Sequence, residues 1–392
     1  MKQSLYYLLL GAFLTCCTPM DQIEPLAYSV LGWEEGSFSN ISRFQTSDHG
    51  VFDLNNIAEY LFFFDKTVTF RVAALEYATV DPHGNPVMAS GVVFHPLNRK
   101  SKGVITVLPT ARIGGNGPSD ELFAIEGITA LHGYTVMLPD LLGFGVSKDL
   151  RSPFLMAENT GRVTYDMRRA AAQYLWDQFR YTLPAETIIM GYSLGGSAAL
   201  ATQKYFETHH GHSVKVKEVF AGGGAYDLPT AFSIFSQTGF SDYPSIPNTI
   251  LAFNHYYRLN LDFEQVFTGA LLHHYNDWYS GNYSVDEIME FLGSNLHDFM
   301  HEDFFNPFGS QNQEFEKLYP HLLENSVSEG WHPKGPIYLS HSKTDTYVPI
   351  ECAEEAVRKL RKAGANISLI TYPGGHYTVG YLHFLRSVIR YL

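Results

Sequence analysis

The sequence has little charge, and positive charge is the scarcer sign. Charged side chains make up 17 % of the 392 residues, and 27 basic against 40 acidic side chains give a formal net charge of −13. No basic run interrupts this acidic excess. Because such a field repels phosphate backbones, we expect no nucleic-acid partner.

Cysteine is almost absent, with three residues in the whole chain, Cys16, Cys17 and Cys352. If the first two are removed or acylated, no intramolecular disulfide remains possible, and stability must come from the apolar core. Cys352 lies within a helical pattern that offers no Cys or His at metal-ligand spacing. We therefore expect a structural role for Cys352 rather than a catalytic one.

The apolar run at the N-terminus, residues 5–14, is too short to span a bilayer as a permanent helix, which favours a cleaved export signal. Residues 14–17, Leu-Thr-Cys-Cys, resemble a bacterial lipobox, in which the cysteine is acylated. We therefore expect residues 1–17 to be a signal peptide with lipidation at Cys17. The expected protein is exported and attached to a bacterial cell envelope membrane by its N-terminal lipid; the alternative is an ordinary signal and a secreted protein.

Apolar and aromatic side chains are abundant. Hydrophobic residues make up 45 % of the chain and aromatic residues 15 %, which is enough for a sizeable core. This composition favours a compact enzyme with aromatic clefts over a disordered scaffold. The length alone suggests two domains, or one large α/β domain that carries an insertion.

Strand and helix patterns alternate along most of the chain. Turn-forming residues 81–86 separate strand patterns at 67–72 and 87–94, which predicts an antiparallel hairpin at a sheet edge. Further strands are predicted at residues 103–108, 134–138, 187–190, 215–220, 337–340 and 367–372, and helices at residues 121–131, 160–179, 193–206, 350–363 and 379–391. The alternation predicts an α/β fold whose mostly parallel sheet is flanked by helices.

This alternation stops near Asp227 and resumes at Pro336. The intervening residues carry helical patterns, are rich in Phe, Tyr and His, and include a capping box at Ser284 and Glu287. We interpret this stretch as a helical cap over the sheet, because it is far longer than a normal connection. The predicted organisation is a tether at 18–40, a first part of the core at 41–228, a cap insertion at 229–335 and a second part of the core at 336–392.

A nucleophile motif stands between a predicted strand and a predicted helix. Residues 191–195, Gly-Tyr-Ser-Leu-Gly, match the G-x-S-x-G elbow in the structural context that it requires. Side chains at Gly191 and Gly195 would collide with neighbouring backbone in so sharp a turn. Ser193 is therefore the predicted nucleophile.

A serine hydroxyl needs a base to remove its proton, and the base needs an acid to orient it. Asp345 and His376 follow two predicted strands, downstream of Ser193 and in the chain order that the elbow motif expects. The carboxyl ends of parallel strands meet at one edge of a sheet, so we expect these three side chains to form a triad. Asp227, just past another strand, is the rival acid.

Acyl transfer also needs donors for the oxyanion that forms on the substrate. The backbone N–H of Leu194, directly after the nucleophile, is one predicted donor, and the loop after the strand at 103–108 should supply the second. We place the second donor at Thr110 or Ala111. Arg112 in the same loop is an alternative contact to the substrate.

No metal site is indicated. His209, His210 and His212 form a short cluster without further ligands, so we interpret them as a solvated loop. His273 and His274 lie in the predicted cap, where core or surface roles are expected in preference to substrate contact. We expect no metal and no organic cofactor.

Several of these segments together resemble the secretory lipase and esterase branch of the α/β-hydrolases. They are residues 139–147 (Pro-Asp-Leu-Leu-Gly-Phe-Gly-Val-Ser), the elbow, the loop around Asp345 and the Gly-Gly-His sequence that ends at His376. The resemblance covers residues 67–392 and implies the α/β-hydrolase fold. Asp140 in the first segment is expected to organise a loop near the site rather than to join the triad.

The resemblance and the triad imply an esterase or lipase that cleaves small carboxylic esters through an acyl-enzyme intermediate. A peptidase or an acyltransferase on the same triad is an open alternative, and so is a surface binding protein without catalysis. The sequence leaves the natural substrate and the oligomeric state open.

Overall fold

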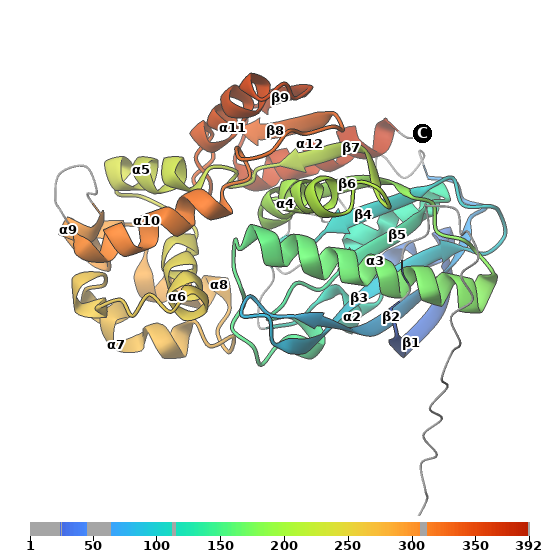
Figure 1. The fold of residues 1–392 in the computed structure, drawn as a ribbon, viewed down its shortest axis with the longest axis horizontal. Helices are drawn as coiled ribbons and strands as arrows, with labels where there is room; N and C mark the ends of the chain where they lie inside the picture. The colour runs from blue at the N-terminus through green and yellow to red at the C-terminus, as the bar shows by residue number, and fades with distance from the viewer. Residues whose placement is uncertain (1–23, 25, 45–63, 112–114, 306–311, 391–392) are drawn as a thin grey trace, which may run out of the picture.

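A computed structural model describes residues 24, 26–44, 64–111, 115–305 and 312–390. Within them, one sheet has the strand order β1-β2-β3-β5-β4-β6-β7-β8-β9 (Figure 1). The strands are β1 (Tyr28–Ser37), β2 (Thr69–Val80), β3 (Pro86–Pro96), β4 (Val104–Leu108), β5 (Thr135–Pro139), β6 (Glu186–Tyr192), β7 (Lys215–Gly222), β8 (Ile337–Ser342) and β9 (Ile367–Tyr372).

The first strands form an antiparallel edge and the rest run parallel. β2 and β3 pair as the predicted hairpin, with Val80 opposite Pro86, and β3 pairs antiparallel with β5. From β5 through β4, β6, β7 and β8 to β9, every neighbouring pair is parallel. The carboxyl ends of these parallel strands therefore lie along one edge of the sheet, where an active site is expected.

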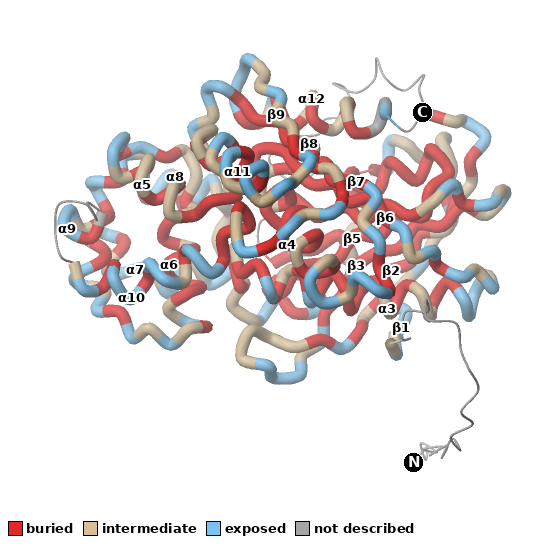
Figure 2. Tube along the Cα trace, turned by 45° about the horizontal axis from the view of Figure 1, so that its top comes forward, coloured by how far each residue is buried: buried red, intermediate tan, exposed pale blue. Residues whose placement is uncertain are grey.

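Helices cover both faces of the sheet. One face packs on α3 (Ala157–Phe179), α4 (Leu194–His209) and α11 (Glu351–Lys362), and the other on α12 (His376–Ile389) and a 3₁₀ helix. Ile188 and Met190 of β6 point to the second face and Ile189 to the first. The central strands are almost continuously buried, while the helices alternate buried and exposed residues (Figure 2). This confirms the predicted α/β fold with a covered sheet.

The segment between β7 and β8 is helical, as predicted. Its helices gather beside one end of the sheet (Figure 1) and are α5 (Leu228–Thr238), α6 (Ser245–Tyr257), α7 (Gly269–Trp278), α8 (Val285–Leu292), α9 (Glu302–Phe305) and α10 (Gln313–Asn325). The capping box opens α8: the Glu287 N–H donates to Ser284 Oγ at 3.1 Å, and the Ser284 N–H to the Glu287 carboxylate at 2.7 Å. Most aromatic side chains of this segment fill its own core, Phe253, Phe267 and Phe304 among them.

The prediction of an irregular tether over 18–40 is wrong for residues 28–37, which form β1. This strand pairs antiparallel with β2 from Tyr28 opposite Tyr77 to Ser37 opposite Thr69. It is an edge strand with side chains largely exposed, and Glu35 forms an ion pair with Arg71 of β2. Because neither face of β1 is fully buried, its sequence lacks the apolar alternation that reveals a strand.

The prediction of one α-helix over 121–131 is also wrong. A single α-helical turn, α2 (Pro118–Glu121), ends at Leu122, whose φ of 56° breaks the helix. A buried 3₁₀ helix, Ile125–His132, follows. Gly127 lies so close to the Phe94 ring of β3 that a Cβ there would approach it to 2.3 Å, so this helix packs tightly against the sheet.

The predicted signal peptide and lipidation at Cys17 lie outside the described residues. In the part of the chain that the structure describes, no helix has both the length and the apolar character needed to cross a membrane.

Candidate active site

Ser193 occupies the sharp turn between β6 and α4. Its φ of 58° and ψ of −124° are unusual for a residue with a side chain, and such strain is typical of functional sites. The Ser193 N–H donates to the Gly222 carbonyl at the end of β7, at 2.8 Å. Neighbouring structure therefore holds the strained turn in place.

Three glycines make this turn sterically possible. A Cβ at Gly191 would lie 2.0 Å from the Gly195 carbonyl oxygen, and one at Gly195 would lie 2.3 Å from that of Leu108. A Cβ at Gly196 would lie 2.2 Å from the carbonyl oxygen of Gly222. The obstacles are backbone atoms, which cannot rotate aside. This confirms the steric reason given for the glycines of the motif.

The structure brings the three predicted triad side chains together. His376, the first residue of α12, has its Nε2 2.9 Å from Ser193 Oγ and its Nδ1 2.7 Å from Asp345 Oδ2. All three come from loops at the carboxyl ends of parallel strands: Ser193 after β6, Asp345 after β8 and His376 after β9. The separations are those of hydrogen bonds, in the succession that activates a serine hydroxyl.

Asp345 is held on both of its oxygens. Its Oδ1 accepts from the backbone N–H groups of Tyr347 and Val348, each at 3.0 Å, while Oδ2 faces His376. Burial acts to raise the pKa of Asp345, but the hydrogen bond and charge of His376, followed by His341 and the Val348 N–H, outweigh it. The pKa therefore lies below its usual range, and the carboxylate is charged at neutral pH.

Three neighbours of the triad were not predicted from the sequence. His341 Nε2 lies 2.9 Å from the Val348 carbonyl and 3.6 Å from Asp345 Oδ2, so it braces the acid loop. The Tyr192 hydroxyl donates to the backbone carbonyl of His376 at 2.5 Å. Tyr347 packs edge-on against the His376 ring, with centroids 5.0 Å apart. Proximity in sequence to Ser193 and Asp345 was the only available signal.

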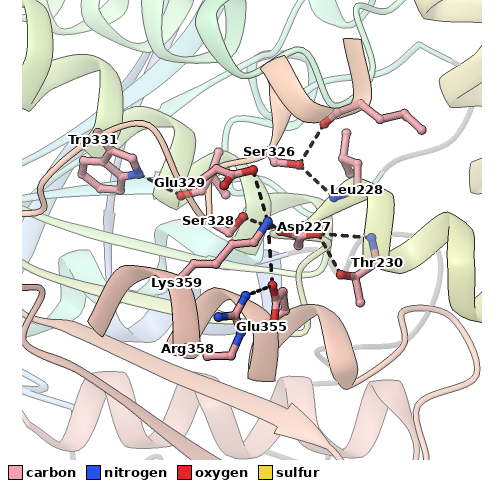
Figure 3. A network of polar contacts seen from close by, with 12 residues as sticks. Asp227, Leu228, Thr230, Ser326, Ser328, Glu329, Trp331, Glu355, Arg358 and Lys359 are labelled. Carbon is pink, nitrogen blue, oxygen red and sulfur yellow. Dashed lines mark hydrogen bonds and ion pairs between the residues drawn. The ribbon is translucent and has the colours of Figure 1, made fainter. Parts of the chain in front are cut away.

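The rival acid, Asp227, is committed to a different set of contacts (Figure 3). Its Oδ2 accepts from Lys359 Nζ at 2.7 Å and from Ser328 Oγ at 2.6 Å, and its Oδ1 accepts from the Thr230 N–H at the start of α5. Burial acts to raise the pKa of Asp227, but the hydrogen bonds from Lys359, Ser328 and Thr230 outweigh it and lower the pKa. Asp227 is thus a helix cap and a structural ion-pair partner.

The two loop residues predicted as oxyanion donors face different spaces. Ala111 lines the cavity that contains Ser193 and Leu194, whereas Thr110 lines a separate buried cavity beside His383. Leu194 is the first residue of α4, so its N–H has no acceptor within the helix and the helix dipole favours a negative charge there. Arg112, the alternative, lies outside the described residues.

Two adjoining cavities open at the site. The inner cavity contains Ser193 and is lined mainly by apolar side chains such as Phe154, Phe232 and Phe235. The outer cavity lies between the loop after β5 and the helical segment. The two share the lining residues Ala111, Phe154, Leu194 and Tyr243, so they adjoin each other and together make up the candidate active-site cleft.

The other residues singled out in the sequence are not among those that line this cleft. Among the described residues, no group of three His, Cys, Asp or Glu side chains is placed to hold a metal ion. His210 stacks on Tyr165 with centroids 3.5 Å apart, and His274 stacks on Trp278. Cys352 is a free, buried thiol whose pKa burial raises well above its usual value.

Asp140 was expected to organise a loop near the site, and it forms contacts of that kind. It is fully buried, accepts from the Ser90 hydroxyl at 2.5 Å and from the Ser119 N–H at 3.1 Å, and also accepts from the Ser119 hydroxyl. Burial raises the pKa of Asp140. Its contacts join β3, α2 and the loop after β5.

Known proteins were compared with the chain. A search of curated proteins gives no match. Among solved structures, an inferred hydrolase from Legionella pneumophila superposes with a TM-score of 0.78 at 19 % identity, over 93 % of this chain and 96 % of that one. The rice cell wall degrading esterase LipA from Xanthomonas oryzae, in a ligand-bound form, gives 0.74 at 23 % identity, over 94 % and 96 %.

A more distant similarity is to Candida antarctica lipase A, with a TM-score of 0.60 at 16 % identity, over 90 % of this chain and 84 % of that one. At these identities the structures establish the fold. The sequence profile of the alpha/beta hydrolase family matches residues 115–386, which include the elbow and the loops that carry Asp345 and His376. The chain is therefore a member of the alpha/beta hydrolase family.

Proposed function

We propose that the protein hydrolyses carboxylic esters through an acyl-enzyme intermediate, with Ser193, His376 and Asp345 as its catalytic residues. The observation that carries this proposal is the unbroken chain of contacts from Ser193 Oγ to His376 Nε2 and from His376 Nδ1 to Asp345 Oδ2, at 2.9 and 2.7 Å. Ser193 lines a mostly apolar cavity, and such a lining suits the acyl or alcohol group of an ester.

In the first half of the reaction, Ser193 Oγ attacks the ester carbonyl carbon while its proton passes to His376 Nε2. The imidazole becomes positively charged, and the Asp345 carboxylate stabilises it through the Nδ1–H. When the tetrahedral intermediate collapses, the C–O bond to the alcohol breaks and His376 returns the proton to the leaving oxygen. The acyl group then remains on Ser193.

In the second half, water takes the place of the alcohol. His376 accepts a proton from water, the hydroxide equivalent attacks the acyl carbon, and the acid leaves as Ser193 regains its proton. The Leu194 N–H, with a second backbone N–H at Ala111, holds the oxyanion in both halves. Each donor of this kind lowers the barrier by about 3 kcal/mol in serine hydrolases.

Ester cleavage is favoured over peptide cleavage by the character of the cleft. The space beside Ser193 is apolar and narrow, and nothing among the described lining residues resembles an extended edge for peptide backbone. Two of the similar structures are named an esterase and a lipase, which supports the same choice. An acyltransferase would use the same acyl-enzyme with an alcohol in place of water.

The test combines labelling with substrate panels. A fluorophosphonate probe should label the wild-type protein and not Ser193→Ala, and p-nitrophenyl esters should be turned over much faster than aminoacyl anilides. Labelling of Ser193 with faster anilide cleavage would instead indicate a peptidase. Absence of labelling would contradict catalysis and favour a binding protein.

We also propose that the protein is exported and attached to a bacterial envelope membrane by lipidation of Cys17, as residues 14–17 suggest. Labelled palmitate should be incorporated by the wild-type protein and not by Cys17→Ala, with Cys16→Ala as the matched control. Incorporation into neither, with secretion of soluble protein, would favour the ordinary signal.

A further inference from the structure

The outer cavity differs in chemistry from the inner one. The inner cavity is lined by aliphatic and aromatic side chains around Ser193. The outer cavity is lined by polar and charged groups, among them Lys148, Asp149, Arg151 and Asn248, together with aromatic side chains such as Trp278. An ester bound across Ser193 therefore places its two halves in unlike surroundings.

The described lining of the outer cavity has more cations than carboxylates, whereas the protein as a whole is acidic. Among the described lining residues, the cations Lys148 and Arg151 stand against one carboxylate, Asp149, although the chain as a whole has a net charge of −13. Lys148 and Asp149 are exposed, whereas Arg151 is half-buried. Arg151 is thus the cation whose charge solvent screens least.

Arg151 also lacks a counter-charge. Its charge is influenced by the phenol groups of Tyr256 and Tyr275, and no carboxylate of the described residues pairs with it. Arg99, which is also partly buried, instead forms an ion pair with Asp65. Burial lowers the pKa of Arg151, so a bound anion would favour its charged form.

The position of Arg151 is fixed by the fold. The Tyr256 hydroxyl, from α6, donates to the Arg151 backbone carbonyl, so the helical segment holds this loop residue in place. Phe154, three residues further on, lines both cavities. The contact holds the Arg151 backbone at the cavity, and its guanidinium offers a planar set of donors that matches a carboxylate.

We propose that the outer cavity binds a carboxylate carried by one half of the substrate ester, with Arg151 as its ligand, while the apolar half lies in the inner cavity beside Ser193. This inference rests on the proposed ester hydrolysis and names the class of ester, a half-apolar ester with a free carboxylate. Arg151 determines specificity and takes no part in the chemical step.

The test compares matched esters on the full-length protein. One pair carries the charge in the alcohol half, 4-(butyryloxy)benzoate against 4-(butyryloxy)benzamide, and the other carries it in the acyl half, phenyl hydrogen glutarate against phenyl glutaramate. For at least one pair, the ratio of kcat/KM for carboxylate over amide should fall about ten- to hundredfold in Arg151→Gln. The responding pair identifies the half that occupies the outer cavity.

Three further proteins sharpen the comparison. Arg151→Lys keeps the charge without the planar donors and should lose an intermediate part of the ratio. Lys148→Gln, an exposed cation, should lower the ratio about two- to fourfold. Arg180→Gln, an exposed arginine at the end of α3, is the matched control and should leave both the ratio and the activity unchanged.

If Arg151→Gln does not fold, inhibition of the wild-type protein still tests the inference. Turnover of a neutral ester should be inhibited more strongly by 4-hydroxybenzoate or glutarate than by the matching amide, and added salt should weaken the difference. Two results would overturn the inference: an unchanged carboxylate-to-amide ratio of kcat/KM in Arg151→Gln, or equal inhibition of the wild-type protein by acid and amide. If the amide esters are still turned over in a Ser193-dependent way, the proposed function stays intact. Absence of all ester turnover would overturn both.

Discussion

Asp227 and Asp345 lie just past the carboxyl ends of the adjacent strands β7 and β8, and both side chains are withdrawn from solvent, with exposed fractions of 1 % and 0 %. Both carboxylates have lowered pKa values, and both accept several hydrogen bonds. They differ in the cation that each faces. Asp227 faces Lys359, which keeps its charge, while Asp345 faces His376, which gains and loses a proton in the proposed cycle.

The comparison shows that position at a strand end does not select the catalytic acid. Asp227 caps α5 and joins it to α11 through Lys359, so its charge is used in holding the helical segment to the core (Figure 3). Asp345 has only backbone N–H donors on one oxygen, which leaves the other oxygen for the imidazole. The groups that contact each carboxylate therefore decide which of the two can orient a base.

The variant Asp345→Asn should have the largest effect and tests whether Asp345, rather than Asp227, is the acid. The amide oxygen can still accept from Tyr347 and Val348, so folding should be nearly unaffected, but the amide cannot stabilise the imidazolium of His376. Ester turnover should fall about 10³- to 10⁴-fold, measured as kcat with an unchanged melting temperature as the control. A loss below tenfold would mean that Asp345 is not the acid.

The matching change at the other strand end should act on stability instead. Asp227→Ala removes both the helix cap and the partner of Lys359, and should lower the free energy of unfolding by about 3 kcal/mol. Asp227→Asn keeps a good cap and should cost about 1 to 2 kcal/mol. Urea unfolding measures both, and kcat of the folded protein should stay within about threefold of wild type. A large loss of kcat with intact folding would restore Asp227 as the acid.

The ion pair behind that difference can be measured in a double-mutant cycle. Asp227→Asn, Lys359→Gln and the double variant should give a coupling energy of about 1 kcal/mol, because Lys359 is partly exposed and also contacts Glu329 at 3.1 Å. Strictly additive effects would show that capping of α5, and not the ion pair, is what Asp227 contributes.

The smallest effect concerns pH. A carboxyl group with a lower pKa in the folded than in the unfolded chain stabilises the fold above the unfolded value, near 4, and this stabilisation is lost as the pH falls through the folded-state pKa. Asp227 and Asp345 both have lowered pKa values, so the free energy of unfolding should decrease as the pH is lowered from about 5 to 3. Asp227→Asn should flatten this slope; an unchanged slope would contradict the assignment.

Much of the fold was predictable because buried parallel strands are continuous apolar runs, while amphipathic helices repeat every three to four residues. The same patterns located the elbow and the two loops that carry Asp345 and His376. The edge strand β1 was missed because its exposed side chains, such as Glu34 and Glu35, carry no apolar alternation. The break at Leu122 was missed because a positive φ at a leucine has no signature in the local sequence.

Within the site, the sequence indicated the candidate triad residues, which the structure brings together, but not what surrounds them. It offered Thr110 and Ala111 as equals, and only the folded loop separates the cavities that they line. The bracing by His341 and the unpaired charge of Arg151 depend on tertiary neighbours from other strands and helices, so no local pattern announces them. The aromatic residues of the helical segment also needed the structure, which shows most of them in its own core.

The most direct test of the account is whether Ser193 and His376 act as one unit. Ester turnover should be measured for Ser193→Ala, His376→Ala and the double variant. In a unit that works as proposed, each single change removes nearly all of the triad's contribution, so the double variant should be no slower than either single variant. Losses that multiply in the double variant, or substantial turnover in His376→Ala, would show that the imidazole does not activate the serine hydroxyl.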